Sequence, residues 1–436
     1  MPSPVMNIDA ITPSFFFPGP PDADHLVRRA LHRYDALLSG LGTDAYNMRR
    51  FRSSAFHLIP LWLSLPLDLS RLTVLELGCG RGLKGLAWAD LFAQYVGVDL
   101  DAHEIAKGRA IWKAAGRSPD ELIHANAADL IRSPSRFGID RVDVLVLYAV
   151  LEHLTPEELD EVFELLRECY DRGTIVLVAE SPNRLYPFDH HSTGLHFVQM
   201  LPYELGRRYL ARSANQEIVR FARAPNDPDC RTQFHRSGRG ISYHDFEVRV
   251  GPPDSLSIAA DGFHPILLDV QPLARAELAL LDYFEDNGMH VPRSFARAWI
   301  DLLLWRDAPR RAPRSLKFRT PTGGVAEPRK QFWQLNRYTV TPHDRQQLLF
   351  DGRDRPPDAT TSLLLIDCED KASGVEVHID NHLVLSAPAQ QLLQMRPPTW
   401  HAQIAVPLHL SRGSEEITVR CPRSSSRTSV FGLLHV

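Results

Sequence analysis

The feature that most constrains this chain is a short apolar run that passes through an acidic residue into three closely spaced glycines. The segment reads Val74-Leu75-Glu76-Leu77-Gly78-Cys79-Gly80-Arg81-Gly82. Glycine adopts a positive φ without steric cost and lets backbone N–H groups approach a ligand closely. A helix that begins after such a turn adds the positive end of its dipole to an anionic group. The segment therefore predicts a buried strand, a ligand-binding turn over residues 78–82 and a helix behind it.

The glycines alone do not identify the ligand. The overlapping segment from Gly80 to Gly85 fits the dinucleotide pattern G-x-G-x-x-G, which by itself is a weak signal. A nucleotide-linked oxidoreductase is therefore one hypothesis, although this match starts two residues late relative to the strand. A second short strand, residues 95–98, ends in Asp99, where a carboxylate can bind the two hydroxyls of a ribose beside the glycine turn.

Two more strand ends follow along the chain. Residues 124–129 read as the end of a third strand, and residues 142–148 read as a fourth strand followed by Leu151-Glu152-His153-Leu154. In this order, the motifs resemble those of the class I S-adenosylmethionine-dependent methyltransferases over residues 71–180. The resemblance implies a doubly wound, mostly parallel, seven-stranded Rossmann-like α/β sheet. It also implies S-adenosyl-L-methionine as cofactor and S-adenosyl-L-homocysteine as product.

The resemblance assigns roles to individual residues. It places Gly78 and Gly80 under the methionine part of the cofactor and Glu76 near its amino end. It places Asp99 on the ribose hydroxyls and Asp129 on the adenine amino group. The other residues expected at the cofactor site are Cys79, Gly82, Leu100, Ala128, Tyr148 and His153.

Composition narrows the function classes. The chain has 436 residues, of which 44% are hydrophobic, enough for one large core and a smaller one. Lys and Arg number 49 against 53 Asp and Glu, so contacts with a nucleic acid backbone are not expected to dominate. Five widely spaced cysteines without a C-x-x-C pair indicate neither a disulfide framework nor a cysteine zinc site, which favours a cytoplasmic location. No apolar segment has the length of a membrane span, so no membrane partner is expected.

Three regions are expected along the chain. Residues 1–69 read as a helical cap or lid, because apolar residues recur at helical spacing over residues 22–65. Residues 70–338 are expected to form the methyltransferase domain, with a substrate-side insertion over about residues 181–260. Its further expected elements are helices over residues 102–115, 203–209, 274–284 and 294–305, a helix begun by Thr155 and Pro156, strands over residues 174–179, 262–270 and 331–338, and a loop or flap over residues 222–240.

After about residue 340, the sequence pattern changes to that of short alternating strands separated by turns such as Asp380-Asn381. The predicted strands cover residues 362–366, 375–380, 382–385, 403–408 and 416–420. This pattern is typical of a β-sandwich or barrel. Residues 339–436 are therefore expected to form a C-terminal, sandwich-like β domain that braces the enzyme, forms a homodimer or binds a glycan.

The segment that follows the fifth strand is the predicted wall of the substrate pocket, because open α/β sheets bind ligands at the carboxyl ends of their strands. Its candidate substrate-binding residues are Glu180, Asn183 and Arg184. Tyr243 and His244 form a second polar-aromatic group that could close over the substrate; a surface strand would explain the same pattern.

Residues 189–196 gather three imidazoles and a carboxylate just beyond the fifth strand. Methyl transfer from a sulfonium is an in-line displacement, which needs alignment and, for a hydroxyl nucleophile, a base. Because histidine titrates near neutrality, His190 and His191 are the candidate bases, with Asp189 orienting an imidazole. Hydrogen bonds that only hold the loop are the alternative explanation.

A divalent metal held by Asp189, Glu180 and His190 or His191 is a further alternative. The residues do not favour it, because relatives that use a metal near the motif after strand four carry an additional Glu where this chain has Ala149. No metal ligand is therefore predicted.

The predicted activity is O-methylation of a sugar, glycan or other hydroxylated metabolite. The histidines near residues 190–191 favour an oxygen acceptor over a nitrogen acceptor. A peptide or carboxylate acceptor is an alternative enzyme function. A non-catalytic glycan-binding protein with a cofactor-sensing front domain is an alternative of a different class.

Overall fold

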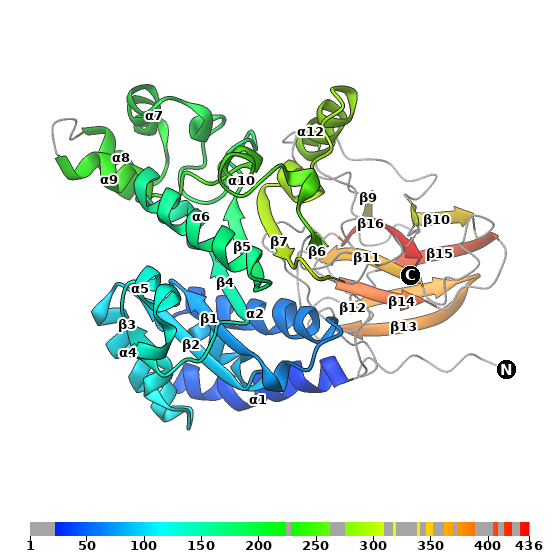
Figure 1. The fold of residues 1–436 in the computed structure, drawn as a ribbon. Coiled ribbons are helices and arrows are strands. Elements are labelled where there is room, and N and C mark those ends of the chain that lie inside the picture. The colour runs from blue at the N-terminus through cyan, green and yellow to red at the C-terminus, as the bar shows by residue number, and fades with distance from the viewer. Residues whose placement is uncertain are drawn as a thin grey trace. The chain divides into compact units, whose positions relative to one another are not determined.

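The computed structural model describes residues 22–223, 228–261, 275–308, 317–319, 338–340, 346–351, 362–368, 374–388, 404–408, 414–420 and 428–435. The chain divides into two compact units, one formed by Pro18–Pro265 with Ala276–Arg310 and the other by Met1–Phe17, Ile266–Arg275 and Arg311–Val436. The described α-helices, most of which are labelled in Figure 1, are α1 Asp22–Gly40, α2 Ala45–Leu63, α3 Leu83–Leu86, α4 Ala102–Ala114, α5 Ala127–Arg132, α6 Pro156–Asp171, α7 Tyr203–Tyr209, α8 Gln216–Arg223, α9 Pro228–Arg236, α10 Tyr243–Arg249 and α12 Arg275–Asp286. No described helix combines the length and the hydrophobicity that crossing a membrane requires.

A seven-stranded sheet with the order β3-β2-β1-β4-β5-β7-β6 forms the centre of the larger unit. Its strands are β1 Thr73–Leu77, β2 Gln94–Asp99, β3 Leu122–His124, β4 Val144–Tyr148, β5 Ile175–Pro182, β6 Ile258–Asp261 and β7 Trp299–Leu304. Strands β1 to β5 are parallel, whereas β7 is antiparallel to both β5 and β6. The predicted doubly wound, mostly parallel α/β fold is therefore confirmed. The strand order reverses at β1 and β4, and ligands bind at the carboxyl ends of strands at such a point.

The central strands are buried along their whole length. Every residue of β4 and β5 is buried, which is typical of parallel strands covered on both faces. Helix α6 lies against β5 and α10. It begins as predicted at the N-cap Thr155, which forms a capping box with Glu158, and Phe163 on its inner face is fully buried.

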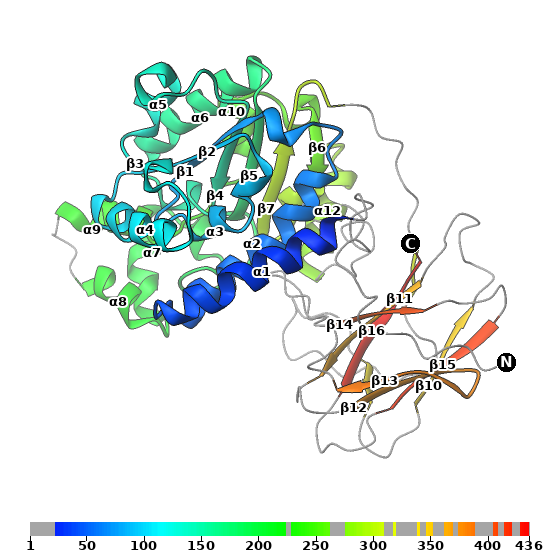
Figure 2. The same ribbon diagram turned by 90° about the horizontal axis from the view of Figure 1, so that it is seen from below.

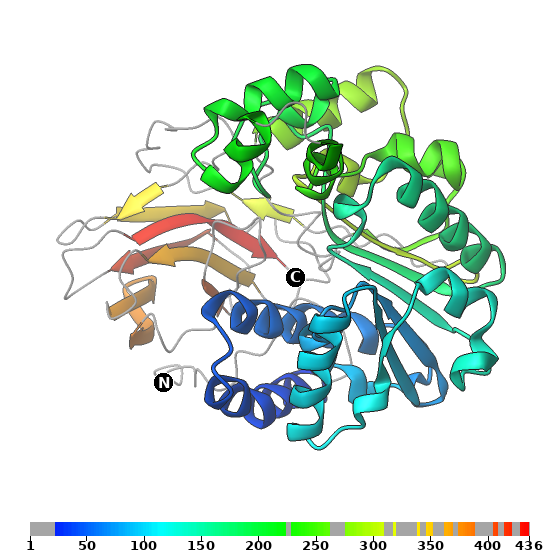
Figure 3. The ribbon, with the colours of Figure 1, turned by 90° about the vertical axis from the view of Figure 1, so that its left-hand side faces the viewer.

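The predicted N-terminal helices lie side by side and pack on the larger unit's sheet (Figures 2 and 3). Aromatic side chains make the connection: Trp62 of α2 lies 5.9 Å from Trp88, which lies 5.5 Å from Tyr95 of β2, measured between ring centroids. The indole N–H of Trp88 also donates to the hydroxyl of Ser54 at 3.0 Å. Helix α2 is thereby fixed beside the strands that carry the glycine turn.

Two elements of the substrate-side insertion differ from the prediction. The loop expected over residues 222–240 instead contributes to two short helices, α8 and α9. Their sequences are mainly polar, but Ile218, Val219 and Phe234 are buried. The second polar-aromatic group is helical rather than a surface strand. It begins helix α10 behind Ser242, which forms a capping box with Asp245.

The end of the sheet also differs from the prediction. The helix expected over residues 294–305 is a short 3₁₀ turn, Arg293–Ala296, followed by strand β7. A short apolar run fits both helix and strand, so periodicity could not decide between them. Strand β7 also takes the place of the antiparallel strand that was expected at residues 331–338. Of those residues only Tyr338 is described, and it belongs to β9. The strand predicted over residues 262–270 lies outside the described residues.

The second unit contains antiparallel strands in two sheets, with the order β10-β15-β12-β13 in one sheet and β14-β11-β16-β8 in the other, where β9 also pairs with β16. The hairpin between β12 and β13 turns at Asp380 and Asn381, which both have positive φ, as the predicted turn requires. A sandwich arrangement, a homodimer and the three proposed region boundaries stay predictions. The strands are β8 Lys317–Arg319, β9 Tyr338–Val340, β10 Gln346–Asp351, β11 Ser362–Cys368, β12 Gly374–Ile379, β13 His382–Pro388, β14 Ile404–Leu408, β15 Ser414–Arg420 and β16 Thr428–His435.

Candidate functional site

The glycine turn connects β1 to α3 and exposes one glycine to a ligand. Gly78, Gly80 and Gly82 have φ values of 67°, 55° and 66°. A Cβ on Gly78 would lie 2.5 Å from Val150, and one on Gly82 would lie 2.7 Å from Trp112. A Cβ on Gly80 would meet no protein atom within 4 Å. The first and last glycines therefore serve internal packing, while the middle one faces space that a ligand can fill.

Cys79 lies inside the turn as a small buried residue. Burial raises the pKa of its thiol, so the sulfur stays protonated at neutral pH. A Cβ on Gly97 of β2 would lie 2.9 Å from this sulfur. Cys79 therefore fills the space between two neighbouring strands.

Glu76 is fully buried at the carboxyl end of β1. The Tyr95 hydroxyl donates to its Oε2 at 2.6 Å. Its Oε1 has no hydrogen-bond partner in the part of the chain that the structure describes, and it lies 4.0 Å from Lys84 Nζ. Burial raises the pKa of Glu76 and lowers that of Lys84 to about 8. An oxygen that is buried without a hydrogen-bond donor lowers the stability of the folded state. The ammonium group of S-adenosylmethionine could donate this hydrogen bond to Glu76. The residues here fit the cofactor.

Asp99 ends β2 beside the turn. Its Oδ2 accepts the Gly80 N–H and its Oδ1 accepts the Asp101 N–H, both at 2.8 Å. Each carboxylate oxygen keeps a further lone pair for a ribose hydroxyl. The next residue, Leu100, is 65% exposed, so it offers an apolar surface on the ligand side of the turn.

The predicted adenine-binding residues lie one element later than expected. The third strand ends at His124, and Ala128 and Asp129 belong to the first turn of α5, which Asn126 caps. Ala128 is buried and Asp129 is exposed. Both residues thus follow the end of β3, and the role of Asp129 in binding adenine stays a prediction.

A buried polar network joins the carboxyl ends of β4 and β5. The Tyr148 hydroxyl donates to Glu180 Oε1 at 2.5 Å, and Arg50 of α2 donates to Glu180 Oε2 at 3.2 Å. The Glu180 N–H donates to Asp301 of β7 at 2.7 Å. Burial raises the pKa of Asp301 to about 7, and the nearby Glu180 carboxylate acts in the same direction. Of these four residues, sequence reasoning found only Tyr148 and Glu180.

The backbone at these two strand ends is strained. Ala149 and Glu180, which are not glycines, have φ values of 55° and 50°. The Ala149 N–H donates to the Ala179 carbonyl at 2.8 Å, which ties the two strand ends together. Non-glycine residues at positive φ gather at functional sites, where the surrounding structure compensates for their cost.

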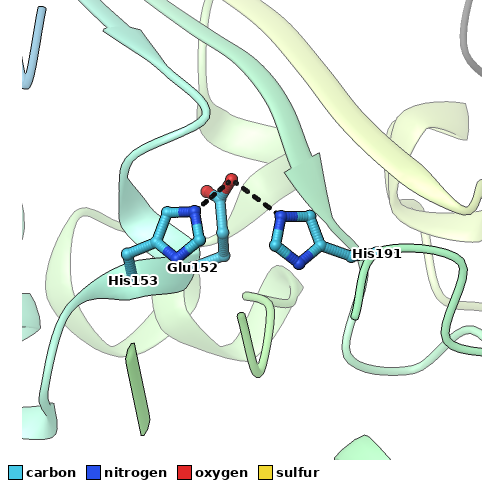
Figure 4. A group of neighbouring side chains, drawn as sticks. All are labelled: Glu152, His153 and His191. Atoms are coloured by element: carbon cyan, nitrogen blue, oxygen red, sulfur yellow. Dashed lines mark ion pairs between the residues drawn. The ribbon is translucent and has the colours of Figure 1, made fainter. Parts of the chain in front are cut away.

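A second group lies over the same strand ends: Glu152, His153 and His191, which we call the Glu152 cluster (Figure 4). Glu152 and His153 lie in the 3₁₀ turn Leu151–His153 after β4, and His191 lies in the loop after β5. The Nε2 atoms of His153 and His191 lie 3.7 Å and 4.0 Å from Glu152 Oε1. That oxygen is buried without a hydrogen-bond partner, and burial raises the pKa of the carboxyl group.

Both imidazoles of the Glu152 cluster present Nε2 to the carboxylate. His153 Nδ1 lies 2.8 Å from the Arg236 carbonyl, so the proton of a neutral ring belongs on Nδ1 and Nε2 carries a lone pair. Burial lowers the pKa of His191 to about 4, which keeps that ring neutral at pH 7. A Cβ on Gly238 would lie 2.2 Å from His191 Nδ1, so this backbone packs closely against the ring.

The other two predicted catalytic residues lie elsewhere. Asp189 accepts the backbone N–H groups of residues 191–193 and the hydroxyls of Ser192 and Thr193, so its hydrogen bonds organise the loop rather than orient an imidazole. The His190 ring packs at 4.6 Å from Phe188 and is not part of the Glu152 cluster. The metal alternative of Asp189, Glu180 and a histidine is not assembled either. The fold joins His191 to Glu152 and His153 instead.

Two of the predicted substrate-binding residues have structural partners. The Asn183 amide donates to the carbonyls of Phe295 and Arg297 at 2.6 Å and 2.8 Å. Arg184 donates to the Gly240 carbonyl at 2.9 Å and 3.2 Å. Both side chains therefore anchor the segment after β5. The Arg184 side chain is still 34% exposed, and contact of either residue with a substrate stays a prediction.

Tyr243 and His244 stack on each other at 3.9 Å at the start of α10. Tyr243 also contacts Phe284 of α12, edge to face at 5.8 Å. The structure thus places this pair against a neighbouring helix, and its contact with a substrate stays a prediction.

Comparison with known proteins found similarity to one segment of the larger unit. Residues 75–176 match the model of a methyltransferase domain family. This segment contains the glycine turn, Asp99, Asp129, Tyr148 and both Glu152 and His153. A comparison with curated proteins gave no significant match.

Solved structures with similarity to the chain include three from different organisms. The PH0226 protein of Pyrococcus horikoshii is 26% identical over 30% of this chain, with a TM-score of 0.26. PKMT2 of Rickettsia typhi is 20% identical over 56%, with a TM-score of 0.36, and an S-adenosylmethionine-dependent methyltransferase of Clostridium acetobutylicum is 16% identical over 29%, with a TM-score of 0.24. The chain spans 58%, 50% and 49% of those chains.

Proposed function

We propose that this chain, whose residues 75–176 form a class I S-adenosylmethionine-dependent methyltransferase domain, transfers a methyl group to a hydroxyl oxygen of a small hydroxylated acceptor. The observation that carries the choice of oxygen is the Glu152 cluster, which brings two imidazoles and a carboxyl group together at the carboxyl ends of β4 and β5.

The cofactor half of the site is the glycine turn with the residues around it. Gly80 offers open space, Asp99 offers acceptors for the ribose, and Leu100 offers an exposed apolar surface. Glu76 offers a buried oxygen for the amino end. When bound, S-adenosylmethionine supplies an electrophilic methyl group on a sulfonium.

The acceptor half of the site must hold a nucleophile and remove its proton. A hydroxyl is a weak nucleophile until it loses its proton, and the ring of His191, which stays neutral at pH 7, offers a lone pair for that purpose. A carboxylate acceptor would need no such group, and it would lie near the buried acids Glu152 and Glu180. The cluster therefore supports an alcohol over an acid.

Transfer of an isotopically labelled methyl group tests this proposal. The full chain is incubated with S-adenosylmethionine carrying a deuterated methyl group and a small-molecule cell extract, and products are identified by mass spectrometry. We expect a labelled methyl ether formed by the wild type and by His190→Gln, the matched control, but not by His191→Gln. Label found only on nitrogen, on a carboxyl group or on polypeptide would refute the proposal.

A further inference from the structure

We infer that the Glu152 cluster is a binding site for one divalent transition-metal ion of the Zn²⁺ or Mn²⁺ type, and that this ion binds the hydroxyl of the methyl acceptor. The role of the ion in activating the acceptor rests on the proposed function. Its binding does not, because the donor atoms stand on their own geometry.

The three donor atoms already converge. Glu152 Oε1 lies 3.7 Å from His153 Nε2 and 4.0 Å from His191 Nε2, and all three donors lie within 4.8 Å of one another. Donors about 2.1 Å from a common ion lie roughly 3.0 to 3.5 Å apart. Small side-chain rotations would therefore be enough to enclose an ion.

The buried carboxylate independently indicates a missing positive partner. The Glu152 side chain has no exposed surface, yet none of the described residues donates a hydrogen bond to its Oε1. Its other oxygen accepts only a long bond, 3.3 Å, from the Ser181 hydroxyl among the described hydrogen bonds. A buried carboxylate with one unsatisfied oxygen is costly, and a metal ion at that oxygen would remove the cost.

The surroundings of His153 are those of a metal ligand. A ligating histidine commonly donates its other ring N–H to a carbonyl, which fixes its tautomer and orientation. His153 Nδ1 is in this position relative to the Arg236 carbonyl. His191 Nδ1 has no hydrogen-bond partner among the described residues; the backbone at Gly238, which has a φ of 90°, packs against that side of the ring, and Nε2 lies on the side of Glu152.

The donor set selects the kind of ion. Two imidazoles and one carboxylate suit zinc, manganese and related transition ions, whereas Mg²⁺ and Ca²⁺ prefer oxygen ligands. Three protein ligands leave positions for an exogenous group, as in catalytic rather than structural sites. An acceptor hydroxyl bound there would have a lowered pKa.

The bonds formed and broken in the resulting methyl transfer balance. With an ion bound, the Nε2 lone pairs of His153 and His191 would be donated to the metal, so the two histidines would hold the ion rather than act as the base. A hydroxyl bound to the ion would lose its proton to solvent water, and its oxygen would form a bond to the methyl carbon. The carbon–sulfur bond breaks with its electron pair remaining on sulfur. The products are the methyl ether and S-adenosylhomocysteine, and neither an oxidant nor a reductant is consumed.

Calorimetric titration of tag-free, chelator-treated protein with Zn²⁺ tests the site directly. We expect one ion per chain, and a loss of affinity of at least about tenfold in each of Glu152→Gln, His153→Gln and His191→Gln. His190→Gln is the matched control, because its ring belongs to the same loop but not to the cluster. Titration with Mg²⁺ should show much weaker binding. Urea unfolding of each metal-free variant reports whether the protein is still folded.

The outcomes separate this inference from the proposed function. Equal Zn²⁺ binding by the wild type and a folded His153→Gln/His191→Gln double variant would overturn the metal site. Undiminished methyl ether formation by metal-free enzyme would also overturn it while leaving O-methylation intact. Cluster-dependent Zn²⁺ binding would support the metal site even if no labelled ether were found, in which case only the proposed function would fail.

Discussion

Replacing Gly80 with alanine separates the ligand-binding role of the glycine turn from its effect on stability. Gly80 has a φ of 55°, and no protein atom lies within 4 Å of the position that a Cβ would take. The new methyl group therefore strains the backbone without a clash, at a cost of about 1 kcal/mol in the free energy of unfolding. If the cofactor lies over this glycine, the same methyl group occupies cofactor space, and affinity should fall at least tenfold, or about 1.4 kcal/mol.

Gly138→Ala is the matched control for this substitution. Gly138 has a φ of 72°, likewise without an atom within 4 Å of the Cβ position, and it follows the 3₁₀ turn Pro134–Phe137 outside the cofactor site. Chemical unfolding should show similar destabilisation of both variants. Calorimetric titration with S-adenosylhomocysteine should show weakened binding only for Gly80→Ala. Equal affinity in the two variants would refute the assignment of the turn to the cofactor.

Three further substitutions test the remaining parts of the site. His191→Gln should lower kcat at least about 100-fold, whereas His190→Gln should retain most activity; comparable steady-state rates in the two would contradict the assignment. Asp301→Asn should flatten the pH dependence of stability between about pH 4 and pH 7. The pKa of Asp301 is raised from 3.8 to about 7, so the folded state retains a proton that the unfolded state releases, and stability falls as pH rises through this window. Urea unfolding at several pH values measures the slope, and an unchanged slope would argue against the shift. Tyr95→Phe should lower the apparent free energy of unfolding by about 1–3 kcal/mol, because buried Glu76 loses its 2.6 Å hydrogen bond; thermal or urea unfolding at the wild-type level would contradict this.

The glycine turn and the central strands could be predicted because their signals are local. An apolar run that passes into glycines at positive φ leaves few alternatives, and Asp99 follows from the next strand end. The short helices α8 to α10 were missed because their sequences are mainly polar, and their burial depends on a few side chains such as Phe234. Strand β7 was missed because an apolar run of six residues fits either element.

The acceptor side of the site depends on contacts that sequence spacing does not determine. Glu152 and His153 were visible after β4, and His191 was visible after β5. Their meeting depends on the path of the loop after β5, which Asp189 organises through its hydrogen bonds. The choice between His190 and His191 depends on which of two adjacent rings faces Glu152. Arg50 reaches Glu180 from helix α2, across 130 positions, and no motif marks it.

A crystal structure of the full chain with S-adenosylhomocysteine would test the central claim most directly. The account predicts the ligand over Gly80, with its ribose on Asp99, its amino group near Glu76 and its sulfur directed toward the Glu152 cluster. A ligand bound elsewhere, or one bound at the turn with its sulfur directed away from Glu152 and His191, would contradict it.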